Sequence, residues 1–469
     1  MSPAGRNDQE MQARAKRERD SAKPQVIGRS HQEMTNSSSW VNDSNAALLT
    51  DLYELTMLEV YFREGMNDTA VFDLFVRRLP ENREFLVACG VEPVLHFLEN
   101  LAFSETSIAY LRSLDTCSSQ FLDSLRKLRF TGDVLAMREG TVVFPNEPIL
   151  EVIAPLPQAQ LIETFVMNQV QLATMAASKA ARVVRAAGGR TVVDFGLRRM
   201  HGTDAGMKAA RAFYIAGIDS TSNTLAGHVY GIPVAGTMAH SYIQAFGNER
   251  EALRRFLRVY PEAILLVDTY DTLEGVRHVI DIARDMGQEF RASGVRLDSG
   301  DLMTLSRQTR QLLDEAGLSR MKIFASSSLD EYEIERLLSN GAPIDGFGVG
   351  TLMATSADAP YLDTAYKLVE YAGQPRIKLP EHKSTLPGRK QVFRQAGRDV
   401  IALSDETLPG VPLLSKVMAN GRRLTPPENL ESCRTRCRSE VERFAGRTQV
   451  VEISGGLEQL GSTLRKRSF

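Results

Sequence analysis

The sequence predicts an α/β protein with two differently organised regions. Beyond Gly188, short β-rich runs alternate with helical segments, which indicates parallel strands covered by helices. Before Gly188, strands and helices are mixed, as in an α+β unit. Polar residues follow almost every β-rich run of the second region. Such a series of strands closes into a barrel or lies open as a doubly wound sheet, and the pattern favours the barrel without excluding the sheet.

The composition is that of a globular protein, and it excludes several classes. Hydrophobic residues make up 43% and charged residues 24% of the 469 residues, and the formal net charge is −2. No global basic field is therefore present to hold nucleic acid, and no apolar run reaches the ~20 residues of a membrane helix. Four cysteines do not make a disulfide framework, so we expect a cytoplasmic protein.

The N-terminal segment differs from the rest of the chain. Basic and acidic residues are interleaved over residues 1–45, and no apolar segment follows that could serve as a signal peptide. We expect this segment to be a disordered tail.

The first globular region is expected at residues 46–158. Its apolar spacing predicts both helices and strands, followed by the long helical pattern Gln160–Ala187. The expected helices are Leu48–Tyr61, Val91–Leu101, Thr106–Leu114 and Ser119–Leu128. The expected strands are Val71–Val76, Asp133–Met137 and Ile149–Ile153.

The second region, expected to end near residue 365, contains the β-rich runs Thr191–Val193, Ile232–Ala235, Ala263–Val267, Gly294–Leu297, Met321–Ala325 and Ile344–Val349. The polar stretches that follow them are Asp194–Arg199, Gly236–His240, Asp268–Asp271, Arg296–Asp301, Ser326–Asp330 and Gly348–Thr351, with a further polar turn at Asp219–Asn223. Parallel strands end at one edge of a sheet, so these stretches together favour one shared pocket. Each stretch alone is equally typical of a helix cap or a turn.

The individual stretches suggest different chemistry. Arg296 and Asp298 share one face of a strand, which gives either a buried ion pair or a pocket with a guanidinium and a carboxylate. The glycines of Gly346–Thr351 suit a phosphate or a tight turn. Arg198 with its neighbour Arg199 suits an anion or a solvated surface. His240 alone is more typical of a capping residue. The pair Cys433 and Cys437 shares a helical face without further ligands nearby, which argues against zinc.

Taken together, these residues resemble the nicotinate phosphoribosyltransferase family. The resemblance extends from about residue 46 to about residue 460. The stretches that carry it are Leu49–Met57, Phe195–Arg199, Gly217–Gly227, Val234–Ser241, Val295–Leu302, Gly348–Thr351, Tyr366–Val369 and Thr385–Lys390.

The resemblance implies a type II phosphoribosyltransferase fold. An N-terminal α/β sandwich, at 46–158, is completed by C-terminal segments at 366–469, and an irregular α/β barrel at 159–365 holds the site. The implied enzyme is a homodimer that joins nicotinate to 5-phosphoribosyl 1-diphosphate and releases diphosphate. ATP hydrolysis is coupled through a phosphohistidine, and Mg²⁺ is required.

The resemblance also implies roles for single residues. It places base stacking at Tyr53 and Phe195, nicotinate contacts at Thr237, Arg296 and the nearby Arg198, phosphorylation at His240, the ribose-side acid at Asp298, the phosphate-binding turn at Gly350 and Thr351, and a further substrate contact at Asp219. A preference for nicotinamide within the same fold, or a non-catalytic metabolite-binding role, is the alternative.

Overall fold

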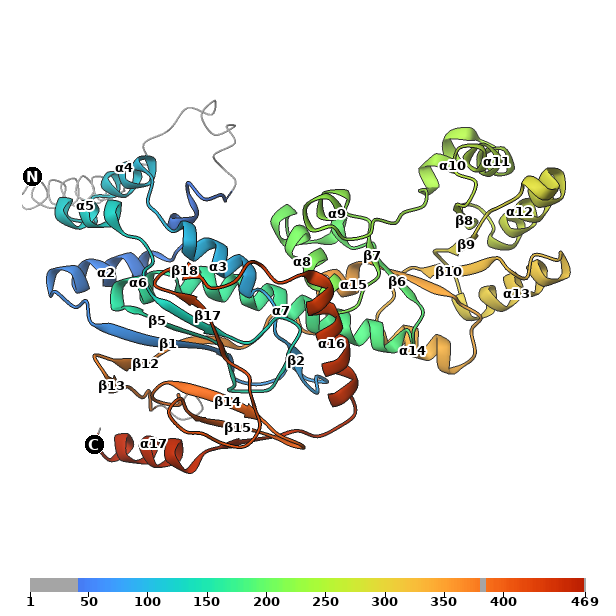
Figure 1. The fold of residues 1–469 in the computed structure, drawn as a ribbon. Coiled ribbons are helices and arrows are strands. Elements are labelled where there is room, and N and C mark those ends of the chain that lie inside the picture. Colours follow the sequence, from blue (N-terminus) through green and yellow to red (C-terminus); the bar gives the residue numbers. More distant parts are fainter. Residues whose placement is uncertain (1–40, 380–384, 468–469) are drawn as a thin grey trace, which may run out of the picture.

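The computed structural model describes residues 41–379 and 385–467. Most of the tail expected at 1–45 lies outside these residues. Figure 1 shows two parts side by side, one built on a large antiparallel sheet and one on a parallel sheet. The long helix α7 (Glu163–Ala186) runs from the first part into the second and supplies buried residues to both cores.

The antiparallel sheet has seven strands in the order β13-β12-β1-β5-β3-β17-β18. Their bounds are β1 (Thr69–Val76), β3 (Asp133–Ala136), β5 (Pro148–Pro155), β12 (Thr364–Tyr371), β13 (Gln374–Pro375), β17 (Ser415–Ala419) and β18 (Arg422–Arg423). The helices of this part are α2 (Leu52–Arg63), α3 (Val91–Asn100), α4 (Glu105–Ser113), α5 (Ser119–Lys127) and α6 (Leu156–Leu161). A short pair, β2 (Leu86–Val87) and β4 (Val142–Val143), joins its core to that of the other part.

C-terminal segments complete this part, as predicted. Strand β12 lies beside β1, and β17 lies beside β3. A second sheet in the order β16-β14-β15-β19 packs below, with α17 (Gly455–Arg467) against it (Figure 1). Its strands are β14 (Lys390–Arg394), β15 (Arg398–Leu403), β16 (Val411–Pro412) and β19 (Val450–Ile453). Helix α16 (Leu430–Phe444) packs on α8 (Thr203–Ile215) of the other part and on β4.

The parallel sheet has six strands in the order β7-β6-β11-β10-β9-β8. They are β6 (Thr191–Asp194), β7 (Ser220–Thr221), β8 (Ile264–Leu266), β9 (Gly294–Leu297), β10 (Lys322–Ser326) and β11 (Gly346–Val349). The helices between them are α8 (Thr203–Ile215), α9 (Thr224–Tyr230), α10 (His240–Phe246), α11 (Glu249–Val259), α12 (Thr272–Met286), α13 (Leu302–Glu315), α14 (Glu331–Ser339) and α15 (Thr351–Ala354). The predicted α/β fold is thus confirmed.

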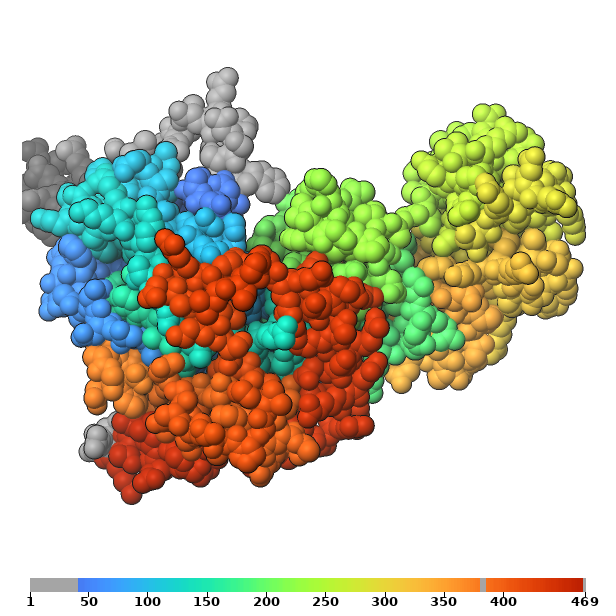
Figure 2. All heavy atoms as spheres, in the orientation of Figure 1, coloured from blue at the N-terminus to red at the C-terminus, as the bar shows by residue number. Residues whose placement is uncertain are grey.

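The barrel is incomplete, because the end strands β7 and β8 are not paired with each other in the described sheet order. Figure 2 shows the surface notched between the green residues of α8 and α9 and the yellow-green residues of α10 and α11. The barrel is open between β7 and β8 because the chain that connects them adds only one isolated bridge to the described sheet, from Thr221 to Val234.

Three sequence-based expectations differ from the structure. The run 232–235 is not a strand, because Pro233 has no N–H to donate and the segment keeps only that single bridge. The expected polar turn at 219–223 instead contains β7. The expected helix Gln160–Ala187 is divided into α6 and α7 at Ile162. No helix in the described ranges combines the length and apolarity needed to cross a membrane.

Candidate functional site

Arg296 is the centre of the polar cluster at the carboxyl ends of the parallel strands. Its side chain projects from β9 toward the loop that precedes α10. There Nη1 donates to Thr237 Oγ1 and Nη2 donates to the Met238 carbonyl at 3.1 Å. Its Nε is buried without a partner among the described residues. Burial lowers the pKa of the guanidinium, although the negative charges of Asp298 and Asp268 act to raise it.

Phe195 forms the aromatic wall beside this guanidinium. The Arg296 Cζ lies 5.8 Å from the centre of the Phe195 ring, within cation–π range. The ring is held because the Phe195 N–H donates to the Val349 carbonyl at 2.8 Å. A Cβ on Gly348 would lie 2.4 Å from the ring, so the glycine leaves room for it. The structure therefore brings Phe195, Thr237 and Arg296 together, as the sequence predicts.

Asp298, two residues after Arg296, and His240, the first residue of α10, form a second group. The His240 Nε2 lies 3.4 Å from Asp298 Oδ2, and its Nδ1 lies 3.1 Å from Thr269 Oγ1. Ser326 Oγ donates to Asp298 Oδ1 at 2.5 Å. The side chains of His240 and Asp298 are 40% and 34% exposed, so both can meet a ligand from solvent.

Asp268 supports this group from beneath. Its Oδ2 accepts the Asp298 N–H at 2.8 Å and the Ser299 hydroxyl at 2.6 Å, while Oδ1 is buried without a partner in the described residues. The side chain follows β8 and therefore ties the ends of β8 and β9 together. This arrangement fixes the backbone from which Asp298 projects.

Sequence reasoning singled out no residue from two of the stretches that build this group. Asp268, Thr269 and Ser326 each contact Asp298 or His240 directly. Their position, just after β8 or at the end of β10, is the feature of the sequence that could have identified them as site residues. The same stretches also provide helix caps, since Asp271 accepts from the Glu274 N–H and Asp330 from the Glu333 N–H, both at 2.9 Å. Both readings of these stretches, cap and site, thus apply to different residues within them.

The remaining predicted anion-binding residues lie at the edge of the cluster. Arg198 is exposed in the short 3₁₀ segment Leu197–Arg199, and its charge opposes protonation of Arg296, which places it near that guanidinium. Gly350 precedes α15 and Thr351 begins it, directly after β11 and beside the chain at Phe195.

Asp219 lies apart from the cluster. It precedes β7, at the amino end of the parallel strands, where its Oδ2 accepts the Val192 N–H at 2.9 Å. Its Oδ1 pairs with Arg434 of α16 at 2.9 Å. The neighbouring Thr221 instead points toward the carboxyl end, where it donates to Asp194 at 2.7 Å. Burial raises the pKa of Asp194.

Tyr53 is also separated from the cluster within one chain. It lies on α2, in the part of Figure 1 opposite to the parallel strands. Its side chain is 47% exposed, and burial together with Glu163, Glu54 and Asp51 raises the pKa of its hydroxyl. The pairing of Tyr53 with Phe195 does not occur within a single copy.

The carboxylates of the cluster suit a metal only together with a ligand. The described parts of the chain contain no group of three His, Cys, Asp or Glu side chains placed to hold an ion by themselves. Mg²⁺ usually takes one or two carboxylates plus substrate phosphates. The half-exposed Asp298 fits that requirement, whereas Asp268 is buried beneath it.

Comparisons with known proteins agree along most of the chain. Residues 48–171 match the nicotinate phosphoribosyltransferase (NAPRTase) N-terminal domain family, and residues 176–365 match the quinolinate phosphoribosyl transferase C-terminal domain family. The chain is 52% identical to the nicotinate phosphoribosyltransferase pncB2 of Mycobacterium tuberculosis, over 87% of this chain and 90% of that one. It is 43% identical to the nicotinate phosphoribosyltransferase of Bacillus subtilis, over 78% and 77%.

Solved structures show the same similarity. The crystal structure of human nicotinic acid phosphoribosyltransferase matches with a TM-score of 0.80 at 28% identity, covering 88% of this chain and 99% of that one. The nicotinate-nucleotide pyrophosphorylase of Pyrococcus furiosus matches with a TM-score of 0.71 at 25% identity, covering 90% and 98%.

Proposed function

Because the chain belongs to the nicotinate phosphoribosyltransferase family, we propose that it transfers the phosphoribosyl group of 5-phosphoribosyl 1-diphosphate to nicotinate. The products are nicotinate mononucleotide and diphosphate, and the reaction begins NAD biosynthesis from nicotinate. The observation that carries this proposal in the chain itself is the partly buried guanidinium of Arg296 against the ring of Phe195, with its Nε left without a partner among the described residues.

This pair suits the chemistry of nicotinate, a flat aromatic anion at neutral pH. The Phe195 ring offers a stacking surface, and the guanidinium and the Thr237 hydroxyl offer hydrogen bonds to the carboxylate. Nicotinamide lacks the negative charge, so a partly buried arginine that has no carboxylate partner in the described part of the chain favours the acid over the amide.

The reaction requires stabilisation of charge rather than a protein nucleophile. Departure of diphosphate leaves a cation-like anomeric carbon, which the nicotinate nitrogen attacks. Asp298, half-exposed beside His240, is placed to hold the ribose hydroxyls and to face this positive charge. We assign the Gly350–Thr351 turn at the edge to the phosphates, and Arg198, near Arg296, to the nicotinate carboxylate. When bound with the diphosphate, Mg²⁺ supplies Lewis-acid stabilisation of the leaving group, and Asp298 is the carboxylate that would hold it.

We assign His240 as the residue phosphorylated by ATP. A carboxylate can only accept a hydrogen bond, so Asp298 favours the tautomer with the proton on Nε2. Nδ1 then keeps its lone pair, toward which the Thr269 hydroxyl donates. Attack of Nδ1 on the γ-phosphorus forms the N–P bond and releases ADP, and water later cleaves that bond to give phosphate. The dianionic group beside the phosphate-binding residues would change their affinity for the sugar diphosphate.

A homodimer would supply what one copy lacks. Tyr53 is exposed and far from its own cluster, and α2 also exposes Leu52 and Val60 on the same side of the helix. An apolar helix face of this kind is suited to an interface, and a second copy could bring its Tyr53 to the Phe195 side of the site. We also propose a cytoplasmic location, because all four cysteines are free thiols and three of them are buried.

The activity is tested by supplying the protein with 5-phosphoribosyl 1-diphosphate, Mg²⁺ and either nicotinate or nicotinamide. We expect diphosphate release with nicotinate and at least about tenfold less with nicotinamide. No release with either base would overturn the assigned reaction, and equal release would overturn the role of the Arg296 charge in base choice.

The energy coupling is tested with γ-labelled ATP on wild type and His240→Ala. Acid-labile, base-stable label should appear in wild type only, and the variant should keep a slow ATP-independent synthesis. The matched control is His278→Ala, because His278 pairs with Glu249 on α11, outside the cluster. Equal labelling of His240→Ala and wild type would mean that His240 is structural.

A further inference from the structure

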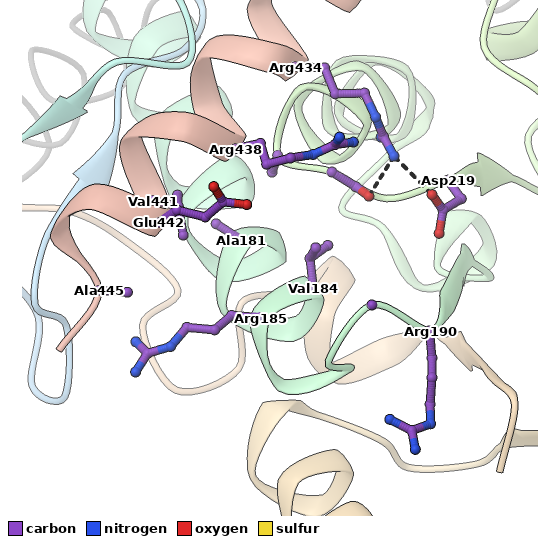
Figure 3. Close-up of a pocket in the computed structure, with 13 residues that line it drawn as sticks. Ala181, Val184, Arg185, Arg190, Asp219, Arg434, Arg438, Val441, Glu442 and Ala445 are labelled. Carbon is purple, nitrogen blue, oxygen red and sulfur yellow. Dashed lines mark hydrogen bonds and ion pairs between the residues drawn. The ribbon is translucent and has the colours of Figure 1, made fainter.

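A second cavity lies at the opposite end of the parallel strands from the site described above. It has a volume of about 460 Å³, within the range of small-molecule sites. Figure 3 shows it between α16, the C-terminal turns of α7 and the connection from α8 to β7. Gly189 and Arg190 precede β6, and Asp219 precedes β7, so the cavity faces the amino ends of both strands.

The walls of this cavity are part apolar and part basic. Small apolar side chains come from all three segments, among them Val184, Ala216 and Val441. Arg185, Arg190, Arg434 and Arg438 stand against Asp219 and Glu442, four positive charges against two negative, which gives the lining a net charge of +2. Glu84, outside the lining, pairs with Arg185 at 3.1 Å and offsets one of these charges.

Arg434 and Arg438 differ in the hydrogen-bond donors that they leave free for a ligand. Arg434 is fully engaged, because it donates to the carbonyls of Tyr214, Ile218 and Gly217 and pairs with Asp219. Arg438, one helical turn further along α16, is exposed and has no hydrogen-bond or ion-pair partner among the described residues. In Figure 3 its guanidinium extends toward that of Arg434, at the end of the cavity near Asp219.

Arg190 lies at the rim, and in Figure 3 its side chain extends away from Arg438, so it adds positive charge rather than a contact inside the cavity. Its Nε donates to the Ile344 carbonyl at 2.8 Å, and both terminal nitrogens remain without partners in the described residues. The cavity therefore combines an apolar wall with the guanidinium of Arg438, whose planar fork matches a phosphate. Glu442 also lines the cavity, with no basic partner among residues 41–379 and 385–467, and it lies on the wall away from Asp219 in Figure 3.

We propose that this cavity is a second binding site for a small phosphate monoester that carries an aromatic ring. The phosphate binds Arg438, and Arg190 extends the positive field, while the ring lies against Val184 and Val441. A phosphate monoester carries a charge of about −1.5 to −2 at neutral pH, opposite in sign to the net charge of the lining, which stays positive when Glu84 is counted with it. The proposal does not depend on the activity proposed above, because no residue of the cavity belongs to the catalytic cluster.

Phenyl phosphate is the probe, titrated into the full chain by calorimetry, with inorganic phosphate and phenol as partial ligands. We expect saturable binding of phenyl phosphate below about 1 mM and at least about tenfold weaker binding of either fragment. Arg438→Gln should weaken phenyl phosphate about tenfold without changing the melting temperature, since the side chain is exposed and unpaired.

Arg443→Gln is the matched control, because Arg443 is an exposed arginine of the same helix that does not line the cavity. It should leave the affinity within about twofold of wild type. Binding that Arg438→Gln leaves unchanged would assign the probe to another site, such as the catalytic cluster, and would overturn the proposal. Absence of saturable binding in wild type would also overturn it.

Discussion

Arg394 in the C-terminal sheet and Arg296 at the barrel mouth are both arginines packed over aromatic rings, yet their partners differ. Arg394 lies 4.7 Å from the Phe444 ring centre and pairs with Asp399 at 2.7 Å and with Glu440. Arg296 lies 5.8 Å from the Phe195 ring centre and binds only a hydroxyl and a carbonyl in the described structure.

The pKa values of the two guanidinium groups follow this difference. Burial lowers the pKa of Arg394, but Asp399 and the other carboxylates outweigh it and the pKa is raised. Burial dominates at Arg296, and its pKa is lowered. The Arg394 guanidinium is neutralised by carboxylates inside the protein and therefore stabilises the fold. The Arg296 guanidinium keeps an N–H donor free among the described residues and is therefore available to a ligand. The four predictions below test this distinction, beginning with the largest expected effect.

Arg394→Met should destabilise the protein by about 3–5 kcal/mol, because it leaves the fully buried Asp399 without its cation. Chemical denaturation measures the loss. The control is Arg398→Met, which removes the exposed pair with Glu452 and should cost no more than about 1 kcal/mol. Similar losses in both variants would contradict the structural role of the Arg394 cluster.

Asp298→Asn should reduce kcat/KM for nicotinate about 100-fold, because the amide keeps the shape of the side chain but removes the charge that faces the ribose and His240. The free energy of unfolding should change by less than about 1 kcal/mol, since the side chain is half-exposed. Steady-state kinetics and denaturation on the same preparation separate the two effects. A variant with normal kinetics and lowered stability would make Asp298 a structural residue.

Arg296→Lys should raise the KM for nicotinate about tenfold, because lysine keeps the charge and loses the planar fork. The comparison variant is Arg198→Lys, which should raise that KM less, since Arg198 is exposed at the edge of the cluster. An unchanged KM in Arg296→Lys would place the guanidinium outside the base site.

Glu54 provides the smallest test, as a buried carboxylate that accepts hydrogen bonds from the hydroxyls of Thr50 and Thr164 and from the Thr164 N–H. Burial raises its pKa from 4.5 to about 7, although Thr164 Oγ1 donates to it at 2.9 Å. The folded state therefore binds the proton more tightly than the unfolded state, and this group's contribution to stability falls as the pH rises from about 4.5 to about 7.

Glu54→Gln should remove that part of the pH dependence. Between pH 5 and pH 8 the melting temperature of wild type should fall further than that of the variant, by on the order of 2 °C. Parallel melting curves of the two proteins, taken across this range, cancel the contributions of all other groups. Superimposable pH profiles would show that Glu54 does not titrate in this range.

Much of the barrel mouth could be predicted from the sequence because its signals are local. The alternation in Gly294–Leu297 predicted β9 with the bounds that the structure has, and with it the shared face of Arg296 and Asp298. Asp219 was grouped with these residues because a polar stretch does not reveal on which side of it a two-residue strand begins. Only the parallel pairing of β7 with β6 shows that Asp219 lies at the amino end of the strands.

Long-range relations were less accessible. Nothing in the local pattern of Thr364–Tyr371 indicates that it lies beside β1, and only the family resemblance suggested that the C-terminal segments return. Likewise, the separation of Tyr53 from Phe195 depends on how two parts of the chain are arranged, which no periodicity encodes.

The pairing of β1 with β12 has a consequence for how the chain is made. Arg77, directly after β1, and Asp363, directly before β12, are joined by an ion pair although they lie 286 positions apart in the sequence. At a synthesis rate of about 5–20 residues per second, one edge of β1 waits roughly 15–60 s for its partner while the whole parallel sheet is being translated. During that time β1 presents an apolar strand with open hydrogen-bonding groups, the element most prone to pair with a wrong chain. Synthesis of β12 therefore removes an edge at which the growing chain can aggregate.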